Sequence, residues 1–129
     1  MSSITNYDEK RRDEIIFGKH DSSAYLGGVR HFDDMTRETL HRLIDEGFVD
    51  VDTAQNDSPS IQDFLDFMDM HDGYVVGGYV VSARRSDYRV SIDTITKTEK
   101  ITETDDLKTF VEFARLADEF NTDGFAWWD

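Results

Sequence analysis

The alternation of apolar and polar residues near the middle of the chain predicts two paired strands. Residues 88–95 alternate with the period of a half-buried strand, and residues 74–83 form a more continuous apolar run before them. The polar stretch 84–87 separates the two runs, so we expect an antiparallel hairpin. Gly77 and Gly78 interrupt the first strand and predict a bulge, because no helix start follows them as a phosphate-binding loop requires.

Three other segments place apolar residues at the three- and four-residue spacing of an amphipathic helix. The first spans residues 36–46, with the Thr36 hydroxyl as its N-cap and Gly47 suited to a Schellman ending. The second begins at Ser58 and Pro59, which are typical of a cap and a first helical turn, and ends at the next glycine.

The remaining segments complete the predicted order of elements. Residues 14–17 and 25–32 are short apolar runs that predict two strands. Residues 104–120 form the third helix, capped by its first residue, a threonine, and residues 125–129 form a terminal strand or extended segment. Residues 1–13 are polar, and we expect them to be flexible.

This order predicts an α+β fold. Hairpins in place of β-α-β crossovers, in the order β-β-α-α-β-β-α-β, favour an antiparallel sheet of about four to five strands with about two to three helices packed mainly on one face. The chain has 129 residues, of which 38% are hydrophobic, and this is enough for one core. We therefore expect residues 1–129 to form a single domain.

Composition excludes several classes of site and of location. The chain has no cysteine, which excludes disulfides, thiolate metal sites and cysteine nucleophiles. No apolar run reaches the roughly 18 residues of a membrane span, and the first residues lack the apolar core of a secretory signal. We therefore expect a cytoplasmic protein that does not bind membranes.

Negative charge is concentrated in one region of the chain. Residues 33–72 contain twelve acidic and two basic residues, so they carry −10 of the total formal charge of −14. Residues 1–32 are balanced, whereas residues 73–101 are slightly basic. A field of this size repels nucleic acid and anionic membranes and attracts basic surfaces and cations.

Salt adaptation is one alternative explanation of this acidity. Carboxylates keep a protein hydrated in a salty cytoplasm, and the chain has 20 Asp and 8 Glu against only five Lys. Salt adaptation should acidify every exposed surface, and the regional bias argues against it. A salt-adapted domain with no charge-specific partner therefore remains as an alternative.

The second predicted helix combines an acidic row with large apolar residues. Asp63, Asp66 and Asp69 recur every third residue on the face opposite its apolar stripe. Phe67 and Met70 project among these carboxylates, where large apolar groups are unusual unless a partner or another part of the protein covers them. An aromatic anchor within a ring of charge is typical of a protein-binding hot spot, so we predict that these five residues bind a basic protein.

The same charges disfavour direct nucleic-acid binding by the two consecutive helices. Phosphate binding requires Lys and Arg, and the second helix has neither. A surface lined with carboxylates can instead imitate the phosphate backbone. We therefore predict a small, acidic, non-enzymatic protein that acts by protein–protein interaction, with inhibition of a basic DNA- or RNA-handling protein by nucleic-acid mimicry as the sharper form. No cofactor is expected.

A metal-assisted hydrolase is an alternative of a different class. Each of the four histidines lies close to a carboxylate, and His31, Asp33 and His71 form a transition-metal site if folding brings them together. No pair of histidines has the i,i+4 spacing of a zinc-protease helix, however. We therefore predict no metal ligands from spacing alone.

The loop from Asp50 to Asp57 resembles the start of a calcium-binding loop, since Asp52 and Asn56 add further oxygen ligands. The motif fails at its decisive positions, because Gln55 stands where it needs glycine and Ile61 where it needs a bidentate glutamate. The sequence also lacks the motifs of nucleophilic catalysis, phosphate-binding loops and dinucleotide binding, and we predict no catalytic residue.

Three residues near the end of the chain have two interpretations each. Asp118 falls beside Leu107 and Val111 on a helical wheel, so it is either a buried, tuned carboxylate or, more simply, one that reaches solvent. Trp127 and Trp128 point to opposite faces if they lie in a strand, and we favour packing of one ring in the core over a terminal docking motif.

Overall fold

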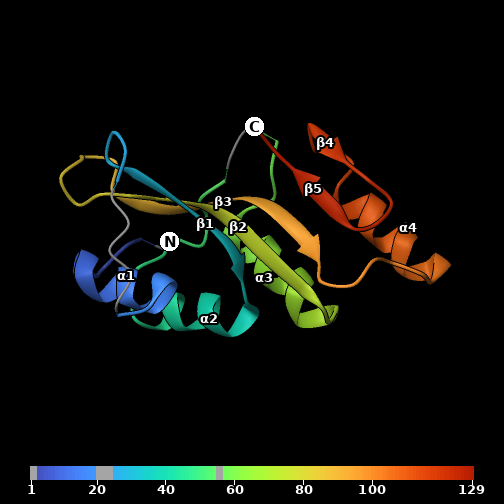
Figure 1. The fold of residues 1–129 in the computed structure, drawn as a ribbon, viewed down its shortest axis with the longest axis horizontal. Helices are drawn as coiled ribbons and strands as arrows, with labels where there is room; N and C mark the ends of the chain where they lie inside the picture. Colours follow the sequence, from blue (N-terminus) through green and yellow to red (C-terminus); the bar gives the residue numbers. More distant parts are fainter. Residues whose placement is uncertain (1–2, 20–24, 55–56) are drawn as a thin grey trace.

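The computed structural model describes residues 3–19, 25–54 and 57–129, and within these ranges it has an α+β fold (Figure 1). The helices are α1 (Glu9–Phe17), α2 (Arg37–Asp45), α3 (Ile61–Met70) and α4 (Thr104–Phe113). The strands are β1 (Val29–Met35), β2 (Tyr74–Val81), β3 (Arg89–Lys97), β4 (Glu119–Phe120) and β5 (Phe125–Trp127). They form one antiparallel sheet in the order β1-β2-β3-β5-β4.

One side of the sheet carries the helices, as predicted. Helices α1, α2 and α3 lie along the same side, and α4 lies beyond α3, near β5 (Figure 1). Val76 and Val80 of β2, Leu40 of α2, Phe64 of α3 and Phe110 of α4 all belong to one continuous core. Of the helices in the described ranges, none is long and apolar enough to cross a membrane.

The predicted hairpin and its bulge are confirmed. β2 and β3 pair over their whole length, and the register shifts between Gly77 and Gly78. A methyl group at Gly78 would lie 1.9 Å from the carbonyl oxygen of Ser91. The bulge therefore brings two backbones closer than any larger residue permits.

Both predicted ends of the first amphipathic helix are confirmed in α2. The Thr36 hydroxyl accepts a hydrogen bond from the Thr39 amide at 3.2 Å. At the other end, the Gly47 amide donates to the Ile44 carbonyl and the Phe48 amide to the Leu43 carbonyl, as the Schellman motif requires.

The strand predicted at residues 14–17 is wrong, because these residues are the last turn of α1. A short apolar run does not by its period distinguish a strand from a helix segment. Here the segment is helical because Asp8 caps its start: the Asp8 side chain accepts a hydrogen bond from the Arg11 amide. The flexibility expected of residues 1–13 stays a prediction, although residues 9–13 are helical here.

Two predicted helix starts are displaced. α3 begins after Ser60 and not after Ser58, because the Ser60 and Asp63 side chains each accept a hydrogen bond from the other's backbone amide. This reciprocal capping box satisfies two amides at once. The N-cap of α4 is Glu103, whose side chain makes no capping bond, and Thr104 is the first helical residue.

The third predicted helix is also too long, because α4 ends at Phe113 and not near residue 120. The Asp118 amide donates to the Trp127 carbonyl and the Asn121 amide to the Phe125 carbonyl. Residues 119–120 therefore pair with β5 as strand β4 instead of continuing the helix. The predicted terminal strand is confirmed as β5.

Candidate functional site

A groove between α3 and the end of α4 contains most of the residues predicted to bind a partner. It has a volume of about 440 Å³, and its lining comes from the loop before α3, the outer side of α3 and the residues around the end of α4. Asp63, Asp66, Phe67 and Met70 line this groove, whereas Asp69 does not.

The floor of the groove is aromatic. The Phe67 ring stacks on the Phe113 ring of α4, with centroids 4.2 Å apart and planes 25° apart, and it meets the Tyr74 ring edge-on at 5.0 Å. Phe67 is only 8% exposed. Of the two alternatives left open for Phe67, cover by another part of the protein therefore holds, because α4 covers the side of α3 that the apolar stripe leaves open.

Two exposed apolar side chains stand above this floor. Met70, at the end of α3, is 79% exposed, and Leu116, three residues beyond α4, is 58% exposed. Both line the groove. Two such residues that line one hollow differ from the scattered single exposures that every protein surface shows.

Most of the charged residues that line the hollow are carboxylates. Asp57, Asp63, Asp66 and Glu112 line the groove together with one cation, Arg115, whose guanidinium lies 3.8 Å from Glu112. Among the residues that the structure describes, no Lys or Arg forms an ion pair with Asp63 or Asp66. The groove therefore keeps a negative rim around an apolar floor.

Two of the rim carboxylates also have local structural roles. Asp63 closes the capping box of α3, with its Oδ2 3.2 Å from the Ser60 amide nitrogen. Asp66 accepts a hydrogen bond from the Gln62 side chain at 2.9 Å, one turn earlier on the same helix. Both side chains are exposed, so these bonds hold the carboxylates in place without removing them from water.

Asp69 lies on a different side of α3. Its Oδ1 is 3.1 Å from His41 Nε2 and 3.7 Å from Arg37 Nε, both on α2. Residues six apart in a helix differ by roughly 120° around the axis, so a row at every third residue cannot stay on one narrow face. The predicted acidic row is thus divided: Asp63 and Asp66 line the groove, and Asp69 joins α3 to α2.

A smaller hollow adjoins the floor on the side of β2 and β3. It is lined in part by Phe67, Tyr74, Lys97 and Asp106. Burial, with a contribution from Asp106, raises the pKa of Tyr74 to about 12. The Tyr74 phenol therefore stays neutral at physiological pH, and Lys97 lies 5.5 Å from its ring centroid as a cation–π partner.

The residues proposed for a metal site are not brought together. Within the described ranges, no group of three or more His, Asp or Glu side chains is placed to hold a metal ion. His31 contacts the Tyr79 ring edge-on at 6.0 Å, whereas His71 lies against Phe67 at 4.6 Å. His20, like Gln55 and Asn56 of the calcium-like loop, lies outside the described residues.

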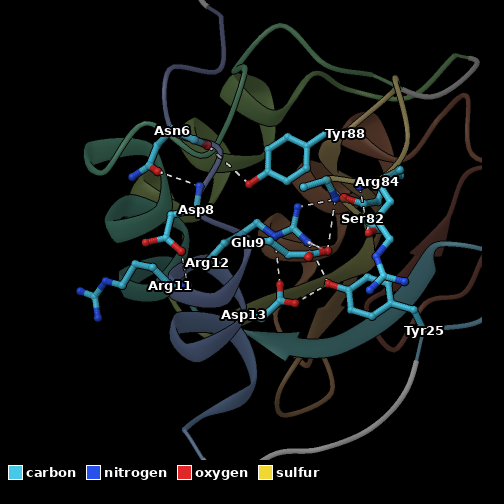
Figure 2. A network of polar contacts seen from close by, with 12 residues as sticks. Asn6, Asp8, Glu9, Arg11, Arg12, Asp13, Tyr25, Ser82, Arg84 and Tyr88 are labelled. Carbon is cyan, nitrogen blue, oxygen red and sulfur yellow. Dashed lines mark hydrogen bonds and ion pairs between the residues drawn. The ribbon is translucent and has the colours of Figure 1, made fainter.

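Sequence reasoning missed a buried arginine that ties α1 to the sheet (Figure 2). Arg12 is fully buried, donates to the Val81 carbonyl at 3.0 Å and to the Tyr25 hydroxyl at 2.8 Å, and pairs with Asp13 at 3.0 Å. The Tyr25 hydroxyl in turn donates to Asp13. Burial and the bond to Asp13 raise the pKa of Tyr25, and the Arg12 guanidinium also lies 4.6 Å from the Tyr88 ring centroid.

The helical spacing of Arg12 with Ile15 and Ile16 was the available signal for this element. This spacing predicts the buried face of a helix only if an arginine is accepted as a core residue. The polar contacts of Arg12 in Figure 2 join α1 to Tyr25 and to the end of β2. We therefore assign this network to the stability of the fold and not to a functional site.

Near the end of the chain, the structure favours packing of one tryptophan ring in the core. Trp128 is buried, with its ring edge-on to Phe64 at 5.4 Å, and Trp127 is half-buried. Asp118 is exposed and accepts a hydrogen bond from the Asp129 amide at 2.6 Å. It is therefore not a desolvated carboxylate.

In comparisons with known proteins, no family model matches the chain, and no curated protein and no solved structure matches it significantly.

Proposed function

We propose that this protein is a small, acidic, non-enzymatic protein of the cytoplasm that binds another protein through the groove between α3 and α4. The observation that supports this best is that exposed Met70 and Leu116 line one hollow over an aromatic floor, inside a rim of carboxylates. Contiguous apolar surface rimmed by polar groups is typical of interaction sites.

The charge of the groove favours a basic partner. Asp63 and Asp66 have no Lys or Arg ion-pair partner among the described residues, and the region from Asp33 to Asp72 carries −10 in formal charge. Complementary potentials steer association and suppress wrong partners. The partner is therefore a protein with Lys and Arg at its contact surface, and its binding weakens as salt increases.

In the sharper form of this proposal, the partner handles DNA or RNA and the carboxylates imitate phosphates. Successive carboxylates on α3 advance about 4.5 Å along the helix axis, compared with about 3.4 Å for phosphates along one DNA strand. The two spacings are similar in scale. Because Asp69 faces α2, the groove presents fewer charges in line than the sequence suggests.

The test compares partner capture by matched variants. Asp63→Asn with Asp66→Asn removes two charges from the rim, and the amide side chain introduced at position 63 keeps an oxygen for the capping box. Glu99→Gln with Glu103→Gln makes the same change in net charge at two exposed residues that do not line the groove. Circular dichroism and urea unfolding establish that both variants fold like the natural protein.

Each protein is immobilised, exposed to cell lysate at about physiological ionic strength, and its retained proteins are identified by mass spectrometry. We expect one basic protein to be retained by the natural protein and by the Glu99/Glu103 variant, and to be lost from the Asp63/Asp66 variant. Release of that protein by added double-stranded DNA supports the mimicry form. Capture of no basic protein, or equal retention by all three proteins, overturns the proposal.

A further inference from the structure

We infer that the groove receives one large apolar side chain of a basic segment of the partner, held between Met70 and Leu116, while neighbouring Lys or Arg residues of that segment lie on the carboxylate rim. This inference rests on the proposed function and specifies what the site binds. It follows from the shape, the rigidity and the charge of the groove.

The hollow suits an inserted side chain because its floor is fixed and its walls can adjust. Phe67 is held by Phe113 on one side and by Tyr74 on another, so the floor is already packed before a partner arrives. Met70 has a flexible, polarisable side chain of the kind that fits irregular partners. A floor that is already ordered avoids the loss of side-chain entropy on binding that weakens many interfaces.

The rim specifies the chemistry around that side chain. Three of the rim carboxylates, Asp63, Asp66 and Glu112, come from the helices on both sides of the hollow, so an inserted side chain has carboxylates on either side of it. A central apolar anchor surrounded by charges of the opposite sign is the arrangement of an interface hot spot with a polar rim.

Two other occupants fit the groove less well. A second copy of this chain brings a formal charge of −14 to a negative surface, which opposes self-association. A small molecule needs a concave site that buries most of its surface, and here the two apolar walls are themselves largely exposed, at 79% and 58%.

The test uses three fluorescein-labelled helical peptides, followed by fluorescence anisotropy. The first contains Lys and Ala with one central Trp, the second has Ala in place of Trp, and the third has Glu in place of every Lys. The natural protein is compared with a wall variant, Met70→Ser with Leu116→Ser, and with the rim variant, Asp63→Asn with Asp66→Asn. The matched control is Leu26→Ser, because Leu26 is 84% exposed but does not line the groove.

We expect the Lys/Trp peptide to bind the natural protein and the Leu26→Ser control equally, and to bind the wall variant about tenfold more weakly. The Lys/Ala peptide should bind the natural protein about tenfold more weakly than the Lys/Trp peptide and should not distinguish the wall variant. The rim variant should weaken the binding of both Lys peptides.

The outcomes separate this inference from the proposed function. Equal binding of the Lys/Trp peptide to the wall variant and the natural protein overturns the inference, and the proposed function survives if the rim variant still weakens binding. If neither variant weakens binding, both are overturned. Absence of Lys/Trp binding at about 1 mM, equal binding of the Glu/Trp peptide, or dimerisation that Met70→Ser with Leu116→Ser abolishes in sedimentation experiments also overturns the inference.

Discussion

The Phe67 ring of α3 stacks on the Phe113 ring of α4, with their centroids 4.2 Å apart. This contact makes Phe67 of the acidic helix part of the core, whereas Met70 on the same helix remains in solvent. The two residues are three positions apart, and only the placement of α4 distinguishes them. The same contact forms the floor of the groove.

Replacement of Phe67 by Ala should destabilise the protein strongly. The change leaves a cavity next to Phe113 and Tyr74, and core Phe→Ala substitutions cost about 3–5 kcal/mol. Urea unfolding followed by circular dichroism measures the loss. Met70→Ala is the matched control, with an expected change within about 0.5 kcal/mol. Equal effects of the two substitutions would show that Phe67 is not buried in solution.

The groove could be predicted from the sequence only in part. Helical spacing correctly places Asp63, Asp66 and Met70 on the outer side of α3, because these positions depend on the helix alone. The burial of Phe67 depends on a helix about 40 residues later in the chain, and Leu116 becomes a wall residue only because α4 ends at Phe113. Periodicity within one segment contains no information on either point.

Replacement of Arg12 by Met should cost about 3–5 kcal/mol, the range for breaking a buried ion pair by removing one partner. Asp13 would lose its guanidinium partner and the Val81 carbonyl its donor. Thermal and urea unfolding measure the change. The neighbouring residue provides the control: Arg11→Met removes a partly exposed pair with Glu46 and should cost much less. A small effect at residue 12 would contradict the assignment of the network to fold stability.

The fold class is predictable here, whereas α1 is not, and Arg12 shows why. Hairpin alternation and helix caps are local signals, and they identify β2, β3 and both ends of α2. A buried arginine reads as a solvent-exposed residue until its partners on distant segments are known. Residues 14–17 therefore look like an isolated apolar run, although they are one turn of a helix that packs through Arg12.

Replacement of Gly78 by Ala should destabilise the hairpin. A Cβ atom at this position would lie 1.9 Å from the Ser91 carbonyl oxygen, and the backbone there cannot move without opening the β2–β3 ladder. The expected loss is about 3 kcal/mol or more, the upper part of the range for overpacking. Gly27→Ala is the comparison, because nothing lies within 4 Å of a Cβ there and only its positive φ opposes the change. A Gly78→Ala protein as stable as the Gly27→Ala protein would contradict the register at the bulge.

Stability should rise at neutral pH when Asp93 is replaced by Asn. Burial raises the pKa of Asp93, although His31 opposes the shift. A raised pKa means that the folded state binds the proton more tightly, so the favourable contribution is present below the ordinary value of about 3.9 and is lost as pH rises through the raised value. Asn resembles the protonated form, so Asp93→Asn should be more stable at pH 7, and the difference should vanish near about pH 3.

Replacement of Glu46 should change stability at pH 7 in the opposite direction, when the free energy of unfolding of both variants is measured by urea unfolding at several pH values. The hydrogen bonds from Arg11 lower the pKa of Glu46, so its contribution is present above the ordinary glutamate value of about 4.3 and is lost as pH falls through the lowered value. Glu46→Gln should therefore be less stable than the natural protein at pH 7 and should converge with it in acid. A common sign for Glu46→Gln and Asp93→Asn would show that net charge, and not local environment, governs both.

Dilute buffer should leave the protein folded. Arg11 and Arg42 balance Glu46, and Asp87 is held by two arginines, so part of the negative charge is neutralised within the fold. Urea unfolding at about 0.01 M and 1 M KCl varies the screening length from about 30 Å to about 3 Å. A salt-adapted domain would unfold at the lower concentration and refold in molar KCl. Such behaviour would explain the carboxylates around the groove without any partner, whereas a protein that stays folded in dilute buffer would contradict the salt-adapted alternative.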